Sequence, residues 1–576
     1  MRGRTLIKSF SAFLLLLASL AAFTVFSERG ETAEPPGLFY LGREQAVRET
    51  ASGSMPEDLI GLFPLAEERQ YGCVLPGDWD TSRLRVFFSG TEELQIDGRF
   101  YRSGDRISLE PDEPFSVSPL SGRESFVTVR QTGGLPVLFI QTDSGSSGAI
   151  HADKSVREPG RLLMTDPDGR VLYREPLTAV RARGNSTFHN DKKPYQIKLA
   201  EKLPLAGERP GRTWILLANA LDRSEIRNTL GLDLARYCGA FAYTPAAQPV
   251  DLYLNNDYQG TYLLTEKVEI ASGRIAVRDL EKLIEDMNPG LDFSALEPLG
   301  ALEYGPGAQK YYDLPAEPED PTGGYLVLLN KKARYDKEAS AFVSERGCPF
   351  TPQEPKYLSR AQTEYLASLF QRAEDALFSE DGVDPASGQH YTELLDLSTL
   401  VSRYLLAEVL DDYDGPYCYF YKDSDPVDPK LYVGPVWDLD NTLGLWSRQC
   451  DPEVLRLSQD QKPAWSWLSQ AAKHADFHAE AAARYARIFR PAIRILLGEE
   501  TDPTGVLRSI DEYAEEVSAS ARTDHFRWPE PPLSDAVAVY YNTASGDSFE
   551  GQVAFLKAYL TVRLDALDAF FEEQVN

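Results

Sequence analysis

Two aspartates in the last quarter of the chain have the types and spacing that suit a bound metal ion. Asp438 and Asp440 flank one residue in GPVWDLDNTLG, directly after an apolar run. Because alternate residues of a strand point to the same face, two carboxylates at this spacing are expected to converge. Ionised carboxylates repel each other, and Mg²⁺ bound by one or two of them together with substrate phosphates relieves that repulsion. A bare pair of this kind is also typical of solvated acids at a strand end.

A second acidic cluster follows a helix that the apolar stripe between Leu397 and Leu410 predicts. It consists of Asp411, Asp412 and Asp414. Carboxylates at the C-terminal end of a helix lie next to the negative end of the helix dipole, which is unfavourable. The cluster therefore indicates a cation nearby, although a solvated helix end also explains it.

The cations of this acidic chain gather in the segment AVRARGNSTFHNDKKPYQIKL. Arg183, Lys193 and Lys198 lie in it, and the turn at residues 184–187 offers backbone N–H groups and hydroxyls. Together these donors could hold phosphate, and a solvated hairpin with a basic face fits the same residues. No GxxxxGK(S/T) loop occurs and no GxGxxG follows a strand, so the usual P-loop and Rossmann sites are excluded.

Two kinds of pattern predict the elements that position these residues. Short alternating stretches predict a small all-β module over residues 81–132, with Asp97-Gly98 typical of a hairpin turn. Strand-like runs continue beyond it, with a second turn expected at residues 255–257 and one helix ending at Gly239. After about residue 356 the spacing becomes helical, apart from one late hairpin. Strands followed by helices predict the α+β class.

Composition limits the classes of function. The chain has 576 residues and a formal net charge of −29, so it would repel the phosphate backbone, and binding to nucleic acid is not expected. The 43% hydrophobic content is that of a globular protein. Five scattered cysteines are too few for a disulfide scaffold, and their odd number leaves at least one thiol without a partner in the chain.

The N-terminus has the pattern of an export signal. Arg2, Arg4 and Lys8 precede an uncharged apolar run at residues 10–26. A cleaved signal peptide and an uncleaved membrane anchor both fit residues 1–28. Either one predicts an extracellular or cell-surface protein. Residues 29–80 are expected to be a polar lead-in segment.

Six motifs in order resemble the CotH family, the spore-coat protein H-like atypical protein kinases. They are RGNST, KKPYQIKL, WILLANALDRSEIRNTLGLDLAR, LYLNNDYQGTYLLTEKVEI, GGYLVLLN and GPVWDLDNTLG. The resemblance implies a kinase-like domain over residues 133–576 with a helical tail from about residue 356. It implies a protein serine/threonine kinase that uses ATP and Mg²⁺. The expected substrates are Ser-rich proteins, and the acidic charge would favour basic ones.

The resemblance also assigns roles to the acidic residues. Asp438 matches the main metal ligand, and Asp440 is expected to assist it. Asp414 takes the catalytic position that orients the substrate hydroxyl and accepts its proton. Asp412 is assigned beside it, although the family often has an amide there.

Three further assignments concern the nucleotide. Lys198 is the candidate for the strand lysine that neutralises phosphates, and Arg183 is a second candidate. Glu266 is placed where either a hinge contact to the base or a structural ion pair is expected.

Two other functions fit the same residues. A CotH-like surface scaffold would keep the fold for binding without transferring phosphate. The string WDLDNT also resembles the DxDxT motif of haloacid-dehalogenase-like phosphatases, in which Asp438 would be the nucleophile and Asp440 the acid–base.

Overall fold

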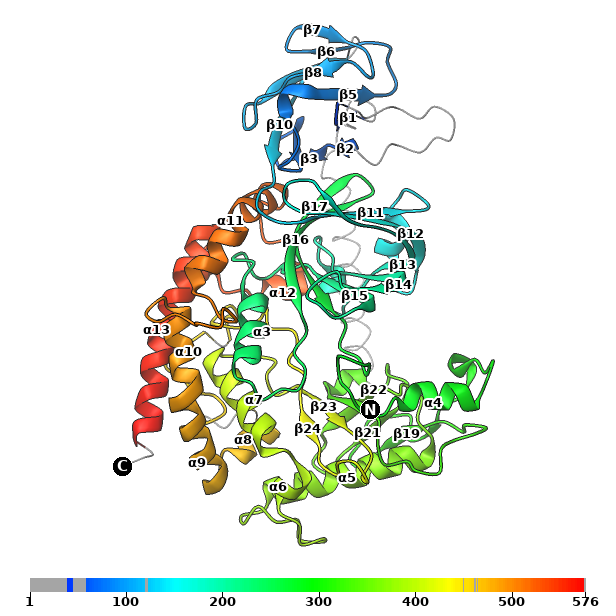
Figure 1. The fold of residues 1–576 in the computed structure, drawn as a ribbon, viewed down its shortest axis with the longest axis vertical. Coiled ribbons are helices and arrows are strands. Elements are labelled where there is room, and N and C mark those ends of the chain that lie inside the picture. The colour runs from blue at the N-terminus through cyan, green and yellow to red at the C-terminus, as the bar shows by residue number, and fades with distance from the viewer. Residues whose placement is uncertain are drawn as a thin grey trace, which may run out of the picture. The chain divides into compact units, whose positions relative to one another are not determined.

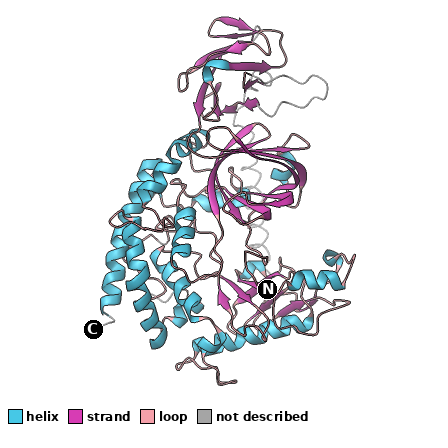
Figure 2. Ribbon diagram, in the orientation of Figure 1, coloured by secondary structure: helices cyan, strands magenta, loops and turns pink. Residues whose placement is uncertain are grey.

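The computed structural model describes residues 39–44, 59–119, 123–448, 450–459, 463 and 465–573. The run at residues 10–26, predicted to be an export signal or anchor, lies outside them. Within the described part, no helix is both long and apolar enough to cross a membrane. The structure is mixed α+β, as the sequence predicts (Figures 1 and 2).

The chain divides into two compact units. The first consists of residues 1–132 and 256–258, and the second of residues 133–255 and 259–576. The first unit contains a four-stranded sheet, β2-β1-β5-β8, and a six-stranded sheet, β3-β4-β10-β9-β6-β7. Its strands are β1 (Phe39–Gly42), β2 (Leu59–Gly61), β3 (Phe63–Pro64), β4 (Gln70–Leu75), β5 (Leu84–Phe88), β6 (Leu94–Ile96), β7 (Arg99–Tyr101), β8 (Arg106–Ile107), β9 (Phe115–Pro119) and β10 (Ser125–Gln131).

The first unit differs from the sequence expectation at its start. Strands β1 to β4 lie inside residues 29–80, which the sequence predicts as a lead-in. Strand β4 pairs in parallel with β10, more than fifty residues later. Such long-range pairing has no local sequence signature. The hairpin at Asp97-Gly98 is confirmed, and both residues have the positive φ that a two-residue turn requires, 45° and 77°.

The second unit begins with a closed barrel in the order β11-β12-β13-β14-β15-β17-β16. The alternating pattern of its strands places apolar side chains such as Ile197 and Trp214 in the barrel core. Residues 255 and 256 form the turn between the last two strands, both with positive φ, while Asp257 already belongs to the strand. The strands are β11 (Val137–Thr142), β12 (Glu158–Thr165), β13 (Val171–Ala182), β14 (Tyr195–Leu203), β15 (Gly211–Leu217), β16 (Ala247–Leu254) and β17 (Asp257–Glu266).

A second sheet of this unit has the order β18-β19-β21-β22-β20-β23-β24. Its central strand β20 pairs antiparallel with both β22 and β23, and β23 forms the late hairpin with β24. The strands are β18 (Leu299–Gly300), β19 (Gln309–Tyr311), β20 (Tyr325–Leu329), β21 (Ala341–Val343), β22 (Pro349–Glu354), β23 (Tyr419–Lys422) and β24 (Tyr432–Val433).

Helices dominate the chain after residue 356, as expected (Figure 2). The predicted helix before Gly239 is also present, and Gly239 follows it with φ 67°. The helices are α2 (Gly148–Ala152), α3 (Arg227–Tyr237), α4 (Leu280–Met287), α5 (Arg360–Phe378), α6 (Tyr391–Leu394), α7 (Leu397–Val409), α8 (Trp467–Ala471), α9 (Ala475–Arg484), α10 (Arg490–Leu496), α11 (Ile510–Arg527), α12 (Asp535–Ala538) and α13 (Phe549–Glu573). All five cysteines are at described positions, and none forms a disulfide.

A buried ion cluster ties the barrel to helix α11. The Lys192 ammonium lies 2.6 Å from Asp524 Oδ1 and 3.2 Å from Glu225 Oε1, and all three side chains are almost fully buried. Removing the cation would leave two carboxylates in an apolar interior with no opposite charge. Lys192 is therefore a structural lysine.

We expect Lys192→Met to lower the free energy of unfolding by about 3–5 kcal/mol, because it leaves buried charge unpaired. Lys198→Met is the matched control, since Lys198 is exposed on β14 of the same segment and should change stability by less than about 0.5 kcal/mol. Urea unfolding followed by fluorescence measures both. Equal midpoints for the two variants would contradict the assignment.

Candidate active site

One cavity of about 550 Å³ brings together residues from both acidic segments and from the basic segment. Its lining includes the turn at residues 183–187 and residues of α3, of the chain after β20 and of the loops around the β23–β24 hairpin. Asp414, Asp438 and Asp440 line it together with Lys331. The structure thus places in one site three carboxylates that the sequence keeps in two segments.

The aspartate pair does not lie on a strand, which corrects the expected geometry. Strand β24 ends at Val433, and Asp438 and Asp440 follow in a loop. Asp438 has φ 65°, in the left-handed region that residues other than glycine rarely adopt. Between them, Leu439 is fully buried, and its N–H donates to Asn228 Oδ1 at 2.8 Å. Because Leu439 is held in the core, both flanking carboxylates stay at the cavity.

The three carboxylates act on one another electrostatically. Burial raises the pKa of Asp438, and Asp414 raises it further, whereas Arg183 and Lys331 lower it. Burial also raises the pKa of Asp440 well above its usual range, and the charge of Asp438 adds to that effect. Asp438 remains in contact with the solvent of the cavity although protein atoms surround it. The site therefore concentrates negative charge that a cation would relieve.

Asp414 lies in the turn that follows α7, and a lysine pairs with it. Lys331 Nζ is 3.0 Å from Asp414 Oδ1, and the same ammonium lies 5.1 Å from the ring centroid of Tyr417. The Asp414 N–H donates to Asp412 Oδ1 at 3.1 Å. The carboxylate is partly open to solvent, so a hydroxyl can approach it.

Asp412 lies outside the cavity, although the resemblance assigns it to the catalytic site beside Asp414. It does not line this cavity; its side chain is buried, with Oδ2 2.8 Å from Arg403 Nη2. Burial raises the pKa of Asp412 to about 6, and Arg403 opposes that shift. The predicted catalytic role is therefore not supported. Asp412 instead holds the backbone of the Asp414 turn.

Arg183, the second candidate for neutralising the nucleotide phosphates, lines the cavity with the aspartates. Its guanidinium carbon is 5.8 Å from the ring centroid of Trp437, and its charge lowers the pKa of Asp438. The next residue, Gly184, has φ 100°, and a Cβ there would lie 2.2 Å from Thr187 Oγ1. Glycine at this position therefore gives the turn its positive φ and its close contact with Thr187.

Two predicted nucleotide-binding residues lie elsewhere. Lys198 is on β14 between the buried Ile197 and Leu199, so strand alternation points it out of the barrel, away from the cavity. Glu266 is fully buried on β17 and accepts two hydrogen bonds from Arg209, at 3.1 and 2.8 Å. Of the two alternatives for Glu266, the structure has the ion pair.

A comparison with known protein families identifies the family of the chain. The family described as CotH kinase protein matches residues 180–567, well over half of the chain. The chain belongs to the CotH kinase family. Asp414, Asp438 and Asp440 all lie within the matched residues, and so does Glu338, the other carboxylate in the lining of the cavity. No curated protein matches the chain.

Several residues that line or hold this cavity were not predicted from the sequence. Lys331 follows β20 and lies 83 positions before its partner Asp414, so no local spacing joins them. Arg334, in the same turn, donates to Asn185 Oδ1 at 2.8 Å across the cavity. Asn228, on α3, accepts the Leu439 N–H and so holds the loop that carries Asp438 and Asp440, here called the aspartate loop. Their roles depend on the tertiary fold.

The donor set at this site suits a divalent cation that is shared with a ligand. Within the described residues, no three Asp, Glu, His or Cys side chains are grouped closely enough to enclose a metal ion. Mg²⁺ is usually held by only one or two carboxylates and completes its octahedron with water and phosphate oxygens. Asp438 and Asp440 fit that arrangement, because burial and repulsion from neighbouring carboxylates raise the pKa of both and a bound cation would oppose this effect.

The phosphatase alternative does not fit this fold. The DxDxT motif belongs at the end of a parallel strand in a βαβ sheet. Here Asp438 follows β24, which pairs antiparallel with β23, and β23 pairs antiparallel with β20. Arg183 and Lys331 also lie close enough to act on the charge of Asp438. The aspartate loop is therefore part of a different architecture.

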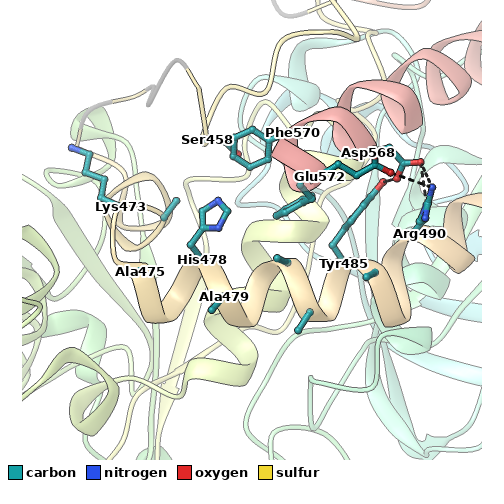
Figure 3. Close-up of a pocket in the computed structure, with 15 residues that line it drawn as sticks. Ser458, Lys473, Ala475, His478, Ala479, Tyr485, Arg490, Asp568, Phe570 and Glu572 are labelled. Atoms are coloured by element: carbon teal, nitrogen blue, oxygen red, sulfur yellow. Dashed lines mark hydrogen bonds and ion pairs between the residues drawn. The ribbon is translucent and has the colours of Figure 1, made fainter. Parts of the chain in front are cut away.

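A larger cavity, of about 1020 Å³, lies among α9, α10 and α13. It is lined mainly by alanines and by His478, Phe570 and Phe571, and Figure 3 shows Tyr485 and Arg490 turned toward Asp568 at one end. It contains none of the residues predicted to act in chemistry. We therefore take the smaller cavity, where acids and cations converge, as the candidate active site.

We expect Gly231→Ala to disturb the aspartate loop, because a Cβ on Gly231 would lie 2.5 Å from Leu439 Cδ1. Overpacking of this kind typically costs about 1–3 kcal/mol. Gly305→Ala is the control, since nothing lies within 4 Å of a Cβ there. Thermal unfolding and Mg²⁺-dependent nucleotide binding are measured together. A Gly231→Ala protein with unchanged binding would show that Leu439 does not fix the loop.

Proposed function

We propose that this protein is an exported atypical protein kinase. It transfers the γ-phosphoryl group of ATP to serine or threonine hydroxyls of surface or extracellular proteins. The proposal rests on one observation: in a chain of the CotH kinase family, three carboxylates and the cations Arg183 and Lys331 belong to a single cavity. Phosphoryl transfer needs mainly positioning and charge stabilisation, which these groups supply.

Each residue has a defined task in this reaction. Asp438 and Asp440 hold Mg²⁺, which would neutralise phosphate charge. Arg183, the turn at residues 184–187 and Lys331 offer donors to the phosphates. Asp414 orients the acceptor hydroxyl and takes its proton as the oxygen–phosphorus bond forms. The bond between the β- and γ-phosphates breaks, and ADP leaves.

Asp412 and Arg403 support this chemistry by holding the turn that carries Asp414. Asp412 accepts the N–H of Asp414 with one oxygen and pairs with Arg403 through the other. Its carboxylate is thus fully engaged in holding the turn. An aspartate in place of the family's usual amide can serve in this position.

The proposed location and substrates rest on the sequence. The basic and apolar N-terminal residues support export. The net charge of −29 favours basic proteins at long range, and the family resemblance supports Ser-rich ones. The rival function, a surface scaffold, would use the same cavity to bind nucleotide without transferring phosphate. Turnover of ATP therefore distinguishes the two proposals.

We expect Asp438→Ala to abolish Mg²⁺-dependent ATP turnover while the protein stays folded, because the substitution removes the main ligand of the cation. Autophosphorylation measured by mass spectrometry, after incubation with ATP and Mg²⁺, is the readout. Circular dichroism checks the fold. Unchanged turnover in the folded variant would remove the metal role from Asp438.

We expect Asp414→Asn to bind ATP as the parent does but to transfer phosphate about 10²–10⁴-fold more slowly, because the group that accepts the proton is lost. Asp412→Asn is the matched control. It keeps an oxygen that can accept the Asp414 N–H, so it should lose far less activity. If the two variants transfer at the same rate, the base is elsewhere.

A further inference from the structure

A second cavity adjoins the active site on the other side of the Asp414 turn. Its volume is about 480 Å³. Lys331 and Tyr417 line both cavities, whereas Asp414 lines the first and Asp412 the second. The turn that carries the proposed base is therefore a wall between the two spaces.

Part of the lining of the second cavity is aromatic. Tyr413, Tyr417 and Trp465 line it with Leu457, and the rings of Tyr417 and Trp465 are 5.1 Å apart. Such walls bind apolar and aromatic side chains, because they remove apolar surface from water on both partners.

The acids of the second cavity are already engaged. Asp412 pairs with Arg403, Glu408 pairs with Arg563 at 2.9 Å, and Asp411 accepts a hydrogen bond from the Tyr559 hydroxyl. Its lining therefore offers no specific partner to a basic side chain. The protein's negative charge attracts basic substrates at long range. This cavity instead contacts the residue next to the hydroxyl that is phosphorylated.

Together these observations identify an occupant. An acceptor hydroxyl must reach Asp414 while the nucleotide fills the first cavity, and the peptide that carries it must continue away from the phosphates. We propose that the second cavity is the acceptor subsite, and that it takes a large apolar side chain next to the serine or threonine that is phosphorylated. This inference rests on the proposed kinase function. It adds a preference for the substrate residue next to the phosphorylated hydroxyl.

The test uses two synthetic fluorescent serine peptides that differ only beside the serine, one with leucine and one with glycine. Fluorescence anisotropy with the full chain, ADP and Mg²⁺ measures binding, and phosphate transfer from ATP measures KM. We expect the leucine peptide to bind at least about 10-fold tighter and to have the lower KM, as one apolar side chain in a fitted pocket typically provides.

Trp465→Ala should bring the ratio of the two peptides' dissociation constants close to 1. It should not change the KM for ATP. Trp465→Gln is a second variant in case the alanine protein unfolds. Trp437→Ala is the matched control from the first cavity, and it should raise the KM for ATP and keep the peptide ratio.

The outcomes separate the two proposals. A ratio near 1 in the parent protein, or an unchanged ratio in both Trp465 variants, overturns the acceptor subsite even if phosphate transfer occurs. If the leucine peptide binds more tightly through Trp465 but no phosphate is transferred, the subsite is supported. Only the kinase activity is then contradicted.

Discussion

Repulsion among three carboxylates in one cavity is the constraint on which the rest of this structure depends. Asp414, Asp438 and Asp440 raise one another's energy when all are ionised, and burial adds to the cost. Such an arrangement persists only where the surrounding fold leaves the side chains no alternative. Arg183 and Lys331 offset part of the repulsion, and a divalent cation with its phosphates would offset the remainder.

The fold holds each carboxylate through a neighbour rather than directly. Leu439, buried in the helical core, fixes the aspartates on either side of it, at the cost of a left-handed φ at Asp438. Asp412, paired with Arg403 of α7, fixes Asp414 through its backbone N–H. Both anchors belong to packed, buried parts of the chain. The acids can therefore face an open cavity while their backbone stays rigid.

The sequence predicts well whatever depends on local chemistry. The turn at Asp97-Gly98 and the helix end at Gly239 have short-range signatures, and the structure has both. The aspartate pair lines the cavity, but from a loop and not from the strand that its spacing predicts. Residues whose role depends on tertiary position are not predicted. Lys198 has a fitting type, but strand alternation turns it outward. Lys331 has no signature at all, because its partner lies in a different segment.

Lys331 also links the two cavities, and this has a consequence for the proposed reaction. Its ammonium pairs with Asp414 and lies over the Tyr417 ring, which is a wall of both spaces. A triphosphate carries more negative charge than one carboxylate and would compete for this lysine. Once Lys331 turns to the phosphate, Asp414 is free to accept the proton of a hydroxyl. Nucleotide binding would then favour acceptor binding, and linkage requires the acceptor to favour the nucleotide equally.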